Sequence, residues 1–416
     1  MIDLFSDKLL IVFAVSLLVN ALVVMTKKHH IDRSARSLDA LAVQAAHKVP
    51  TPRMGGLGIV AALLVGLMIW MPNQQEVHWG LFALSLSPIF VAGLAEDLGY
   101  GVSPLRRLLA AAVSSALCVA MLGLWVPHTD IPVLDGLFAF APVAILFTVF
   151  VTSGTCHAFN LIDGVNGLAS GTGIIVAFGF ATIAASAGET EIAMAAYFLI
   201  AAVLGFLVFN YPFGKIFLGD AGAYTVGYVL AWFAVFLLAK VETLTTFSVL
   251  LVLFWPIADT LLAIYRRRRS GKPAGQPDRL HFHQLVMRTF EIAHFGRNRR
   301  HIANPLTSLV ILPLVAAPMV AGVLLWDKPL ASFVALVVFS ALFFAAYLLG
   351  MQFTYKVARK VNRATQVARL RGAGLPAARR AVDLPVSADT AGPKWGGSKD
   401  ISLSGGLEPR AAVDSH

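Results

Sequence analysis

The stretch "IAMAAYFLIAAVLGFLVF" (192–209) decides the fold class, because it runs for eighteen residues without a charge. An α-helix needs about 20 apolar residues to cross the hydrocarbon core of a bilayer. Similar stretches recur along the 416 residues, which are 57% apolar and only 13% charged, whereas soluble domains carry about 25% charged residues. The sequence therefore predicts an all-α polytopic membrane protein with about eleven transmembrane helices. The expected spans are 8–25, 55–71, 80–96, 105–124, 137–153, 168–186, 191–209, 222–238, 245–264, 304–325 and 329–351.

The distribution of basic residues predicts the orientation of these spans. With the N-terminus outside, 30 of the 33 Lys and Arg residues fall on the cytoplasmic side, and only Lys8, Lys240 and Lys328 fall outside. The positive-inside rule favours this arrangement, so we expect the longer loops and the C-terminus to be cytoplasmic. The net charge of +10 then faces anionic lipid headgroups and cytosolic anions. Membrane lipid is therefore an expected partner, and nucleic acid is not.

The chain divides into two expected regions. Residues 1–355 form one membrane domain, because the outside loops are too short to hold a site. Residues 356–416 form a cytoplasmic tail that is basic as far as Arg380 and then rich in Gly, Pro, Ser and Asp, a composition that indicates disorder. The two cysteines, Cys118 and Cys156, lie in or near spans and indicate no disulfide framework.

Five inside segments carry side chains that are capable of chemistry. Glu96, Asp97, Asp163, Asp220 and Asp259 all fall at or near the inner ends of spans. A single such acid can simply cap a helix, but five at one face favour a functional site, because ionisable groups in a bilayer are expensive. A transporter would also use acids, although its site tends to lie near the midplane. The segments are "HKVPTPRMGG" (47–56), "AEDLGYGVSPLRR" (95–107), "FNLIDGVNGLA" (159–169), "NYPFGKIFLGDAGA" (210–223) and "RRRRSGKPAGQPDRLHFHQL" (266–285).

Glycines and histidines accompany these acids. Asp163-Gly164 and the Asn-Gly pair at 166–167 are turn dipeptides, and such loops bring backbone N–H groups close to a phosphate. Carboxylates among glycines suggest Mg²⁺, which takes one or two carboxylates plus substrate phosphates. Arg279 and His283 would share a face in a helix, whereas His281 and His283 would share a side only in an extended loop. A Zn²⁺ site needs more ligands than this, so phosphate binding is favoured over metal ligation.

The joint occurrence of these motifs resembles the polyprenyl-phosphate N-acetylhexosamine-1-phosphate transferases, over roughly residues 45–290. Such enzymes transfer a sugar-1-phosphate from a UDP-sugar to undecaprenyl phosphate, release UMP and use Mg²⁺, for which Mn²⁺ is a substitute. The resemblance implies a multi-pass enzyme of the bacterial inner membrane, with cytoplasmic catalytic loops and with a UDP-N-acetylhexosamine and undecaprenyl phosphate as substrates. It leaves a homodimer open. The motifs are "TPRMGG", "EDLGYGVSPLRR", "NLIDGVNGLA", "NYPFGKIFLGDAGAYTVGY", "PIADT" and "DRLHFHQL".

The resemblance also implies roles for single residues. Asp220 is the implied Mg²⁺ ligand, Asp97 is an essential acid near the metal and the acceptor phosphate and a second candidate ligand, and Phe217 stacks on uracil. The implied catalytic residues are Asp97, Asp163, Asp220, His281 and His283. The implied substrate-binding residues are Lys48, Glu96, Arg106, Asn160, Gly164, Asn166, Asn210, Phe217 and Arg279.

Two departures from the family pattern narrow these expectations. Glu96 stands where family members often carry Asp, and its longer side chain weakens a role as a direct metal ligand. "HFHQ" (281–284) replaces the fuller histidine run of the peptidoglycan branch. The sequence thus favours an enzyme that initiates O-antigen, capsule or other surface polysaccharide. It resembles the branch that uses UDP-N-acetylglucosamine but leaves the N-acetylhexosamine itself open.

The implied reaction is phosphoryl transfer, in which positioning and charge neutralisation dominate. Lys48, Arg106 and the 279–283 loop are the expected sources of positive charge beside the metal. Asp97 acts either as a base or as a positioning group, and either a single or a double displacement is compatible with the sequence. The alternatives from other classes are an inner-membrane transporter of an anionic metabolite and a scaffold without activity.

Overall fold

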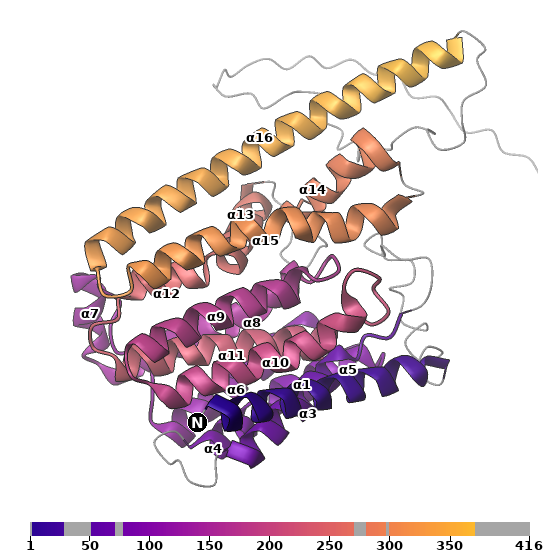
Figure 1. Ribbon diagram of the computed structural model, residues 1–416. Coiled ribbons are helices and arrows are strands. Elements are labelled where there is room, and N and C mark those ends of the chain that lie inside the picture. The colour runs from indigo at the N-terminus through magenta and orange to yellow at the C-terminus, as the bar shows by residue number, and fades with distance from the viewer. Residues whose placement is uncertain (1, 29–50, 71–77, 270–279, 297–298, 371–416) are drawn as a thin grey trace, which may run out of the picture.

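The computed structural model describes residues 2–28, 51–70, 78–269, 280–296 and 299–370, and this part of the chain is helical without any strand. Eight helices are long and apolar enough to cross a membrane. They are α1 (Ile2–Met25), α6 (Pro104–Leu122), α8 (Ala141–Ile162), α9 (Leu168–Ser186), α10 (Thr190–Asn210), α11 (Gly219–Lys240), α15 (Arg300–Leu324) and α16 (Pro329–Leu370). The structure is that of a polytopic α-helical membrane protein (Figure 1).

Two further expected spans are bent pairs of helices. The pair α4 (Trp79–Ser85) and α5 (Ser87–Asp97) bends by 40°, and the pair α12 (Thr246–Val252) and α13 (Phe254–Arg269) bends by 84°. Proline lacks an N–H and is tolerated in the first turn of a helix; Pro88 and Pro256 lie in the first turns of α5 and α13. The remaining expected span, 55–71, is the shorter helix α3 (Gly55–Trp70). The number of membrane crossings and the orientation stay predictions.

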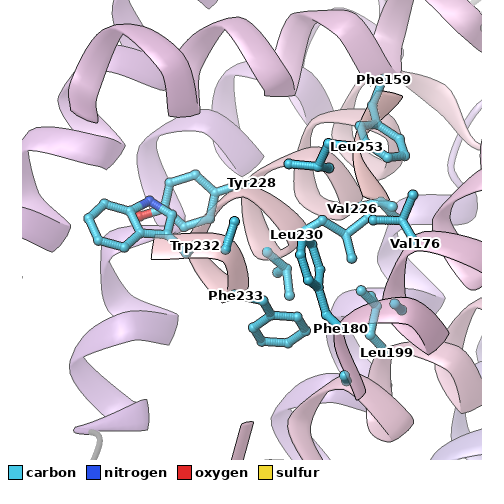
Figure 2. Packing of buried hydrophobic residues seen from close by; sticks show 14 of the residues in the cluster. Phe159, Val176, Phe180, Leu199, Val226, Tyr228, Leu230, Trp232, Phe233 and Leu253 are labelled. Carbon is cyan, nitrogen blue, oxygen red and sulfur yellow. The ribbon is translucent and has the colours of Figure 1, made fainter. Parts of the chain in front are cut away.

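Helix α11 lies at the centre of the bundle (Figure 1), and all of its residues from Gly219 to Leu238 are buried. It packs against α3, α5, α8 and α9. Figure 2 shows its side chains Tyr228, Trp232 and Phe233, with Phe159 of α8 and Phe180 of α9 close by. A helix that is apolar on all sides is buried in the core of its bundle, and α11 begins at the acid-bearing motif "GDAGA" (219–223).

Several helices end or begin around the first residue of α11. Asp97 ends α5, α6 begins after Ser103, and α8 ends just before Asp163. Ser103 caps α6 by accepting a hydrogen bond from the Arg106 N–H at 3.4 Å, as hydroxyl side chains do at helix starts. The short helices α7 (Pro132–Phe138) and α14 (Phe282–Phe290) and a π-helical turn (Glu291–Phe295) complete the described chain.

Helix α16 is longer than a membrane crossing requires. Its 42 residues extend about 60 Å at 1.5 Å per residue, and it lies along one edge of the bundle in Figure 1. The expected boundary between the membrane domain and the tail, at 355–356, falls within this helix. The tail beyond residue 370 lies outside the described residues.

Candidate active site

The site is built around two acids on neighbouring helices. Asp97 is the last residue of α5, and its carboxylate accepts hydrogen bonds from the backbone N–H groups of Asp220 at 2.8 Å and Ala221 at 2.9 Å. A carboxylate at a helix N-terminus is stabilised by the helix dipole, so Asp97 caps α11. Gly219 has a positive φ of 74°, and a Cβ there would collide with the Arg53 carbonyl oxygen and the Asp97 carboxylate. The close approach of the two acids therefore requires glycine at 219.

The Asp220 carboxylate is held by cations and an amide. Its Oδ1 accepts hydrogen bonds from Asn160 Nδ2 at 3.1 Å and from Arg53 Nη2 at 3.4 Å, and its Oδ2 is bonded by Arg107 Nη1. Arg53 Nε also lies 3.8 Å from Asp97 Oδ1. Both acids are only 3% exposed, and buried charges persist only when they are paired. We call Asp97, Asp220, Arg53, Arg107 and Asn160 the carboxylate–arginine cluster.

Asp163 adds a third carboxylate near this cluster. It follows the last residue of α8, and burial raises the pKa of its carboxyl to about 7, with Arg53 opposing the rise and Asp220 adding to it. Both oxygens of Asp97 accept backbone N–H groups that hold the start of α11, whereas the partners of the Asp220 carboxylate are side chains that can be exchanged. Asp220 and Asp163 are therefore the acids better placed to ligate a cation. One or two carboxylates, with phosphates supplying the rest, is the ligand set that Mg²⁺ uses. Within the described residues, three or more His, Cys, Asp or Glu side chains do not gather into a metal site.

A second group of polar residues lies where α13 meets α14. Asp259 Oδ2 bonds His281 Nδ1 at 2.7 Å, and Asp259 Oδ1 accepts the Phe282 N–H at 3.0 Å. The ring of His283 lies parallel to that of His281, with ring centroids 5.7 Å apart. We call Asp259, His281 and His283 the histidine cluster, and all three are buried.

His283 is a neutral imidazole at pH 7. Burial lowers its pKa to about 4, with Asp259 opposing the shift and His281 adding to it. Its Nε2 atom is buried and has no hydrogen-bond partner in the described part of the chain. A Cβ at Gly164 would collide with this same atom, so glycine at 164 lets the loop lie directly against the His283 ring. The expectation that the 279–283 loop brings positive charge therefore does not apply to His283 at neutral pH.

The loop 163–167 joins the two clusters, since Asn160 before it contacts Asp220 and Gly164 within it contacts His283. Two of the amides expected to bind substrate, Asn166 and Asn210, form hydrogen bonds that hold this loop. Asn166 donates from its backbone N–H to Asn304 Oδ1 at 2.8 Å and from Nδ2 to the Pro212 carbonyl at 3.0 Å. Asn210 accepts the Gly167 N–H at 2.7 Å and donates to the Ile216 carbonyl at 2.8 Å. In this structure Asn166 and Asn210 therefore position backbone.

Other expected site residues have different surroundings. Glu96 Oε2 accepts the Val102 N–H at 2.5 Å and so closes the turn after α5. Arg106 is exposed, whereas Arg107 is the arginine that contacts Asp220. The ring of Phe217 is half-buried, and its backbone carbonyl accepts the Gly55 N–H at 3.0 Å. Lys48 and Arg279 lie outside the described residues.

The sequence analysis assigned no catalytic or binding role to three members of the two clusters, Arg53, Arg107 and Asp259. Arg53 and Arg107 lie inside the motifs "TPRMGG" and "SPLRR". The second motif does not reveal which of its two arginines, Arg106 or Arg107, faces the site. Asp259 was expected at the inner face, and only the 84° bend between α12 and α13 with the return of α14 brings it to His281. The motifs "PIADT" (256–260) and "HFHQ" (281–284) mark the two segments but not their contact.

Comparison with known proteins places the chain in a family. The profile of glycosyl transferase family 4 matches residues 78–238. A probable undecaprenyl-phosphate N-acetylglucosaminyl 1-phosphate transferase of Bacillus subtilis is 31% identical over 71% of this chain and 81% of its own length. A decaprenyl-phosphate N-acetylglucosaminephosphotransferase of Mycobacterium leprae is 29% identical over 63% of this chain and 73% of its own length. An undecaprenyl-phosphate α-N-acetylglucosaminyl 1-phosphate transferase of Yersinia pestis is 24% identical over 76% of this chain and 84% of its own length.

Fold and site thus define a polytopic membrane protein whose buried acids and arginines meet where the central helix begins. The chain belongs to glycosyl transferase family 4, among the polyprenyl-phosphate hexosamine-1-phosphate transferases. This confirms the family that the motifs indicated.

Proposed function

We propose that this protein transfers N-acetylhexosamine-1-phosphate from a UDP-sugar to a polyprenyl phosphate and releases UMP. The observation that carries the proposal is the buried Asp97–Asp220 pair with two arginines at the start of α11. An anionic acceptor must approach a diphosphate in this reaction, and catalysis of phosphoryl transfer depends on positioning and charge neutralisation. The relatives, named as undecaprenyl- and decaprenyl-phosphate transferases of N-acetylglucosamine phosphate, support undecaprenyl phosphate and UDP-N-acetylglucosamine as the substrates.

Each residue of the carboxylate–arginine cluster has a separate role in this proposal. Arg53 and Arg107 neutralise phosphate charge, because a guanidinium binds phosphate oxygens in the same bidentate manner as carboxylate oxygens. Asp97 positions Asp220 by holding the N-terminus of α11. Because both Asp97 oxygens already accept backbone N–H groups, a positioning role for Asp97 is favoured over a role as general base. The acceptor phosphate is mostly dianionic at neutral pH, because its second pKa is about 6, and it attacks the β-phosphorus while UMP leaves.

Mg²⁺ is the proposed cofactor, with Mn²⁺ as a substitute. Asp220 would hold it, with Asp163 as the second carboxylate, and the oxygen-only donor set fits this hard cation. The bound cation would neutralise charge on the diphosphate. The raised pKa of Asp163, to about 7, reflects burial together with the negative charge of Asp220. A cation between these carboxylates would favour their ionised forms.

The proposal includes a location and an orientation. The enzyme would lie in the bacterial inner membrane, with the N-terminus outside and the site at the cytoplasmic face. In support, the basic ends of α13 and α15, with Arg266–Arg269 and Arg300, lie on the same segments that lead to and from the histidine cluster. The product would be the first lipid-linked sugar of an O-antigen, capsule or other surface polysaccharide.

A reconstituted assay tests this function. The purified protein is mixed with undecaprenyl phosphate and, in turn, UDP-N-acetylglucosamine and UDP-N-acetylgalactosamine, and both lipid-linked product and UMP are measured. We expect equal amounts of the two products from one donor, with Mg²⁺ required, and loss of both in the Asp220→Asn variant. Movement of an anionic metabolite across vesicles without UMP release would replace this proposal with a transporter.

A further inference from the structure

His157 lies beside the carboxylate–arginine cluster, although it falls outside all of the motifs identified in the sequence. It precedes Asn160 by three residues on α8, so both side chains share a helix face. Asn160 bonds Asp220, and the His157 ring packs edge-on against Tyr224, with ring centroids 4.9 Å apart. Tyr224 follows Asp220 by one turn on α11. His157 therefore sits one turn deeper in the bundle than the Asn160–Asp220 contact.

Two nitrogens at this depth lack partners. His157 Nε2 and Arg107 Nε are both buried, and neither has a hydrogen-bond partner within the described residues. The His157 imidazole has a backbone hydrogen bond with Arg107 and is acted on by the charges of Arg107 and Asp220, which places the three side chains in one neighbourhood. A buried polar atom without a partner is destabilising, and a site that keeps two of them is suited to a ligand that supplies acceptors.

We propose that His157 Nε2 and Arg107 Nε together bind a phosphate oxygen of a substrate. A guanidinium N–H can only donate, and the imidazole donates from Nε2 when the ring carries a proton on that atom, so the complementary group carries lone pairs and negative charge. Arg107 contacts Asp220 through Nη1, which leaves Nε for a second partner. This inference rests on the proposed function, in which both the UDP-sugar and the polyprenyl phosphate carry such oxygens.

The variants are chosen to separate hydrogen bonding from packing. His157→Leu keeps an apolar body against Tyr224 and removes both nitrogens, whereas His157→Gln restores an amide near the position of Nε2. His128→Leu is the matched control, because His128 Nε2 is also buried without a partner in the described chain. Arg107 lies in the first turn of α6, and His128 follows the last turn of the same helix. The length of α6, about 27 Å, therefore separates the control from the cluster.

The measurement is the Michaelis constant for each substrate, varied separately with the full-length protein. A hydrogen bond to a charged group contributes enough for His157→Leu to raise one Michaelis constant about 10- to 100-fold and leave the other within about 3-fold. His157→Gln recovers most of the loss, and His128→Leu matches the wild type. The substrate whose constant rises identifies the source of the phosphate. A rise for the UDP-sugar is accompanied by weaker inhibition by UDP but not by uridine.

Three outcomes overturn the inference. Unchanged Michaelis constants in a folded His157→Leu protein would show that His157 makes no contact with a substrate phosphate. An equal rise for both substrates, or failure of His157→Gln to recover activity while unfolding temperatures match, assigns His157 to packing against Tyr224. If the wild type itself forms no lipid-linked sugar, the proposed function fails, and this result is distinct from failure of the His157 inference alone.

Discussion

The carboxylate–arginine cluster and the histidine cluster differ in how completely their polar atoms are bonded. All four carboxylate oxygens of Asp97 and Asp220 have partners, which are backbone N–H groups, arginines or Asn160. In the histidine cluster, Asp259 and His281 bond each other, but His283 Nε2 is buried without a partner in the described residues. In the described residues, the carboxylates of the first cluster are thus fully bonded, and the vacant atom there is Arg107 Nε, on a cation, whereas the vacant atom of the second cluster lies on a neutral ring.

The difference indicates how each cluster meets a substrate. Buried carboxylates whose oxygens are all bonded must exchange partners on binding, since a buried charge left unpaired is strongly destabilising. We therefore expect incoming phosphates to draw Arg53 and Arg107 from Asp220, whose carboxylate then becomes available to a cation. A vacant neutral nitrogen such as His283 Nε2 can gain a hydrogen bond without breaking one. Its effect should accordingly be smaller.

The largest effect is expected from the arginine pair 106–107. Arg107→Ala removes the partner of Asp220 Oδ2, and an arginine that neutralises phosphoryl charge is worth about 10³-fold or more in turnover. Arg106→Ala, a change of the same type at an exposed neighbour, should keep the rate within a few-fold. The rate of lipid-linked product formation by each purified variant provides the measurement. Equal losses in the two variants would contradict the assignment of Arg107 to the cluster.

The next effect concerns the pH dependence of stability through His283. Its folded pKa of about 4 lies below the usual value near 6.5, so between these pH values the unfolded chain binds the extra proton and stability falls as the pH falls. Between pH 7 and pH 5 the loss should be about 2 kcal/mol. His283→Gln should remove this part of the acid sensitivity, as followed by thermal unfolding at both pH values. Asp259 and His281 face His283 and remain in both proteins, so identical pH slopes would show that His283 is not buried as a neutral group.

The smallest effect is expected at Glu96, an acid next to the cluster that only closes a turn. Glu96→Gln keeps an oxygen that can accept the Val102 N–H, and one hydrogen bond is worth about 1 kcal/mol. Turnover should stay within a few-fold of the wild type, and the unfolding temperature should change by only a few degrees. A loss comparable to that of Arg107→Ala would mean that Glu96 contacts substrate or metal.

The sequence was sufficient for the apolar helices and for the acids that gather at their ends, because both follow from charge and hydropathy along the chain. It could not separate Arg107 from Arg106, because that choice depends on the phase of α6 against α11. It also assigned Asn166 and Asn210 to substrate binding but could not show their bonds to Pro212 and Gly167, because those bonds depend on how two segments distant in sequence meet. The Asp259–His281 bond needed the 84° bend before α13, which local composition does not encode.

The most direct test of the division between Asp97 and Asp220 is the binding of UDP-N-acetylglucosamine by calorimetry, with and without Mg²⁺, to the Asp→Asn variant at each position. Asp97→Asn should retain Mg²⁺-enhanced binding while lowering turnover and the unfolding temperature, because this acid positions α11. Asp220→Asn should remain folded, lose the Mg²⁺ enhancement and form almost no lipid-linked product. A folded Asp220→Asn protein that keeps Mg²⁺-enhanced binding and near-normal turnover would contradict the role of Asp220 as the carboxylate that meets the metal and the substrate.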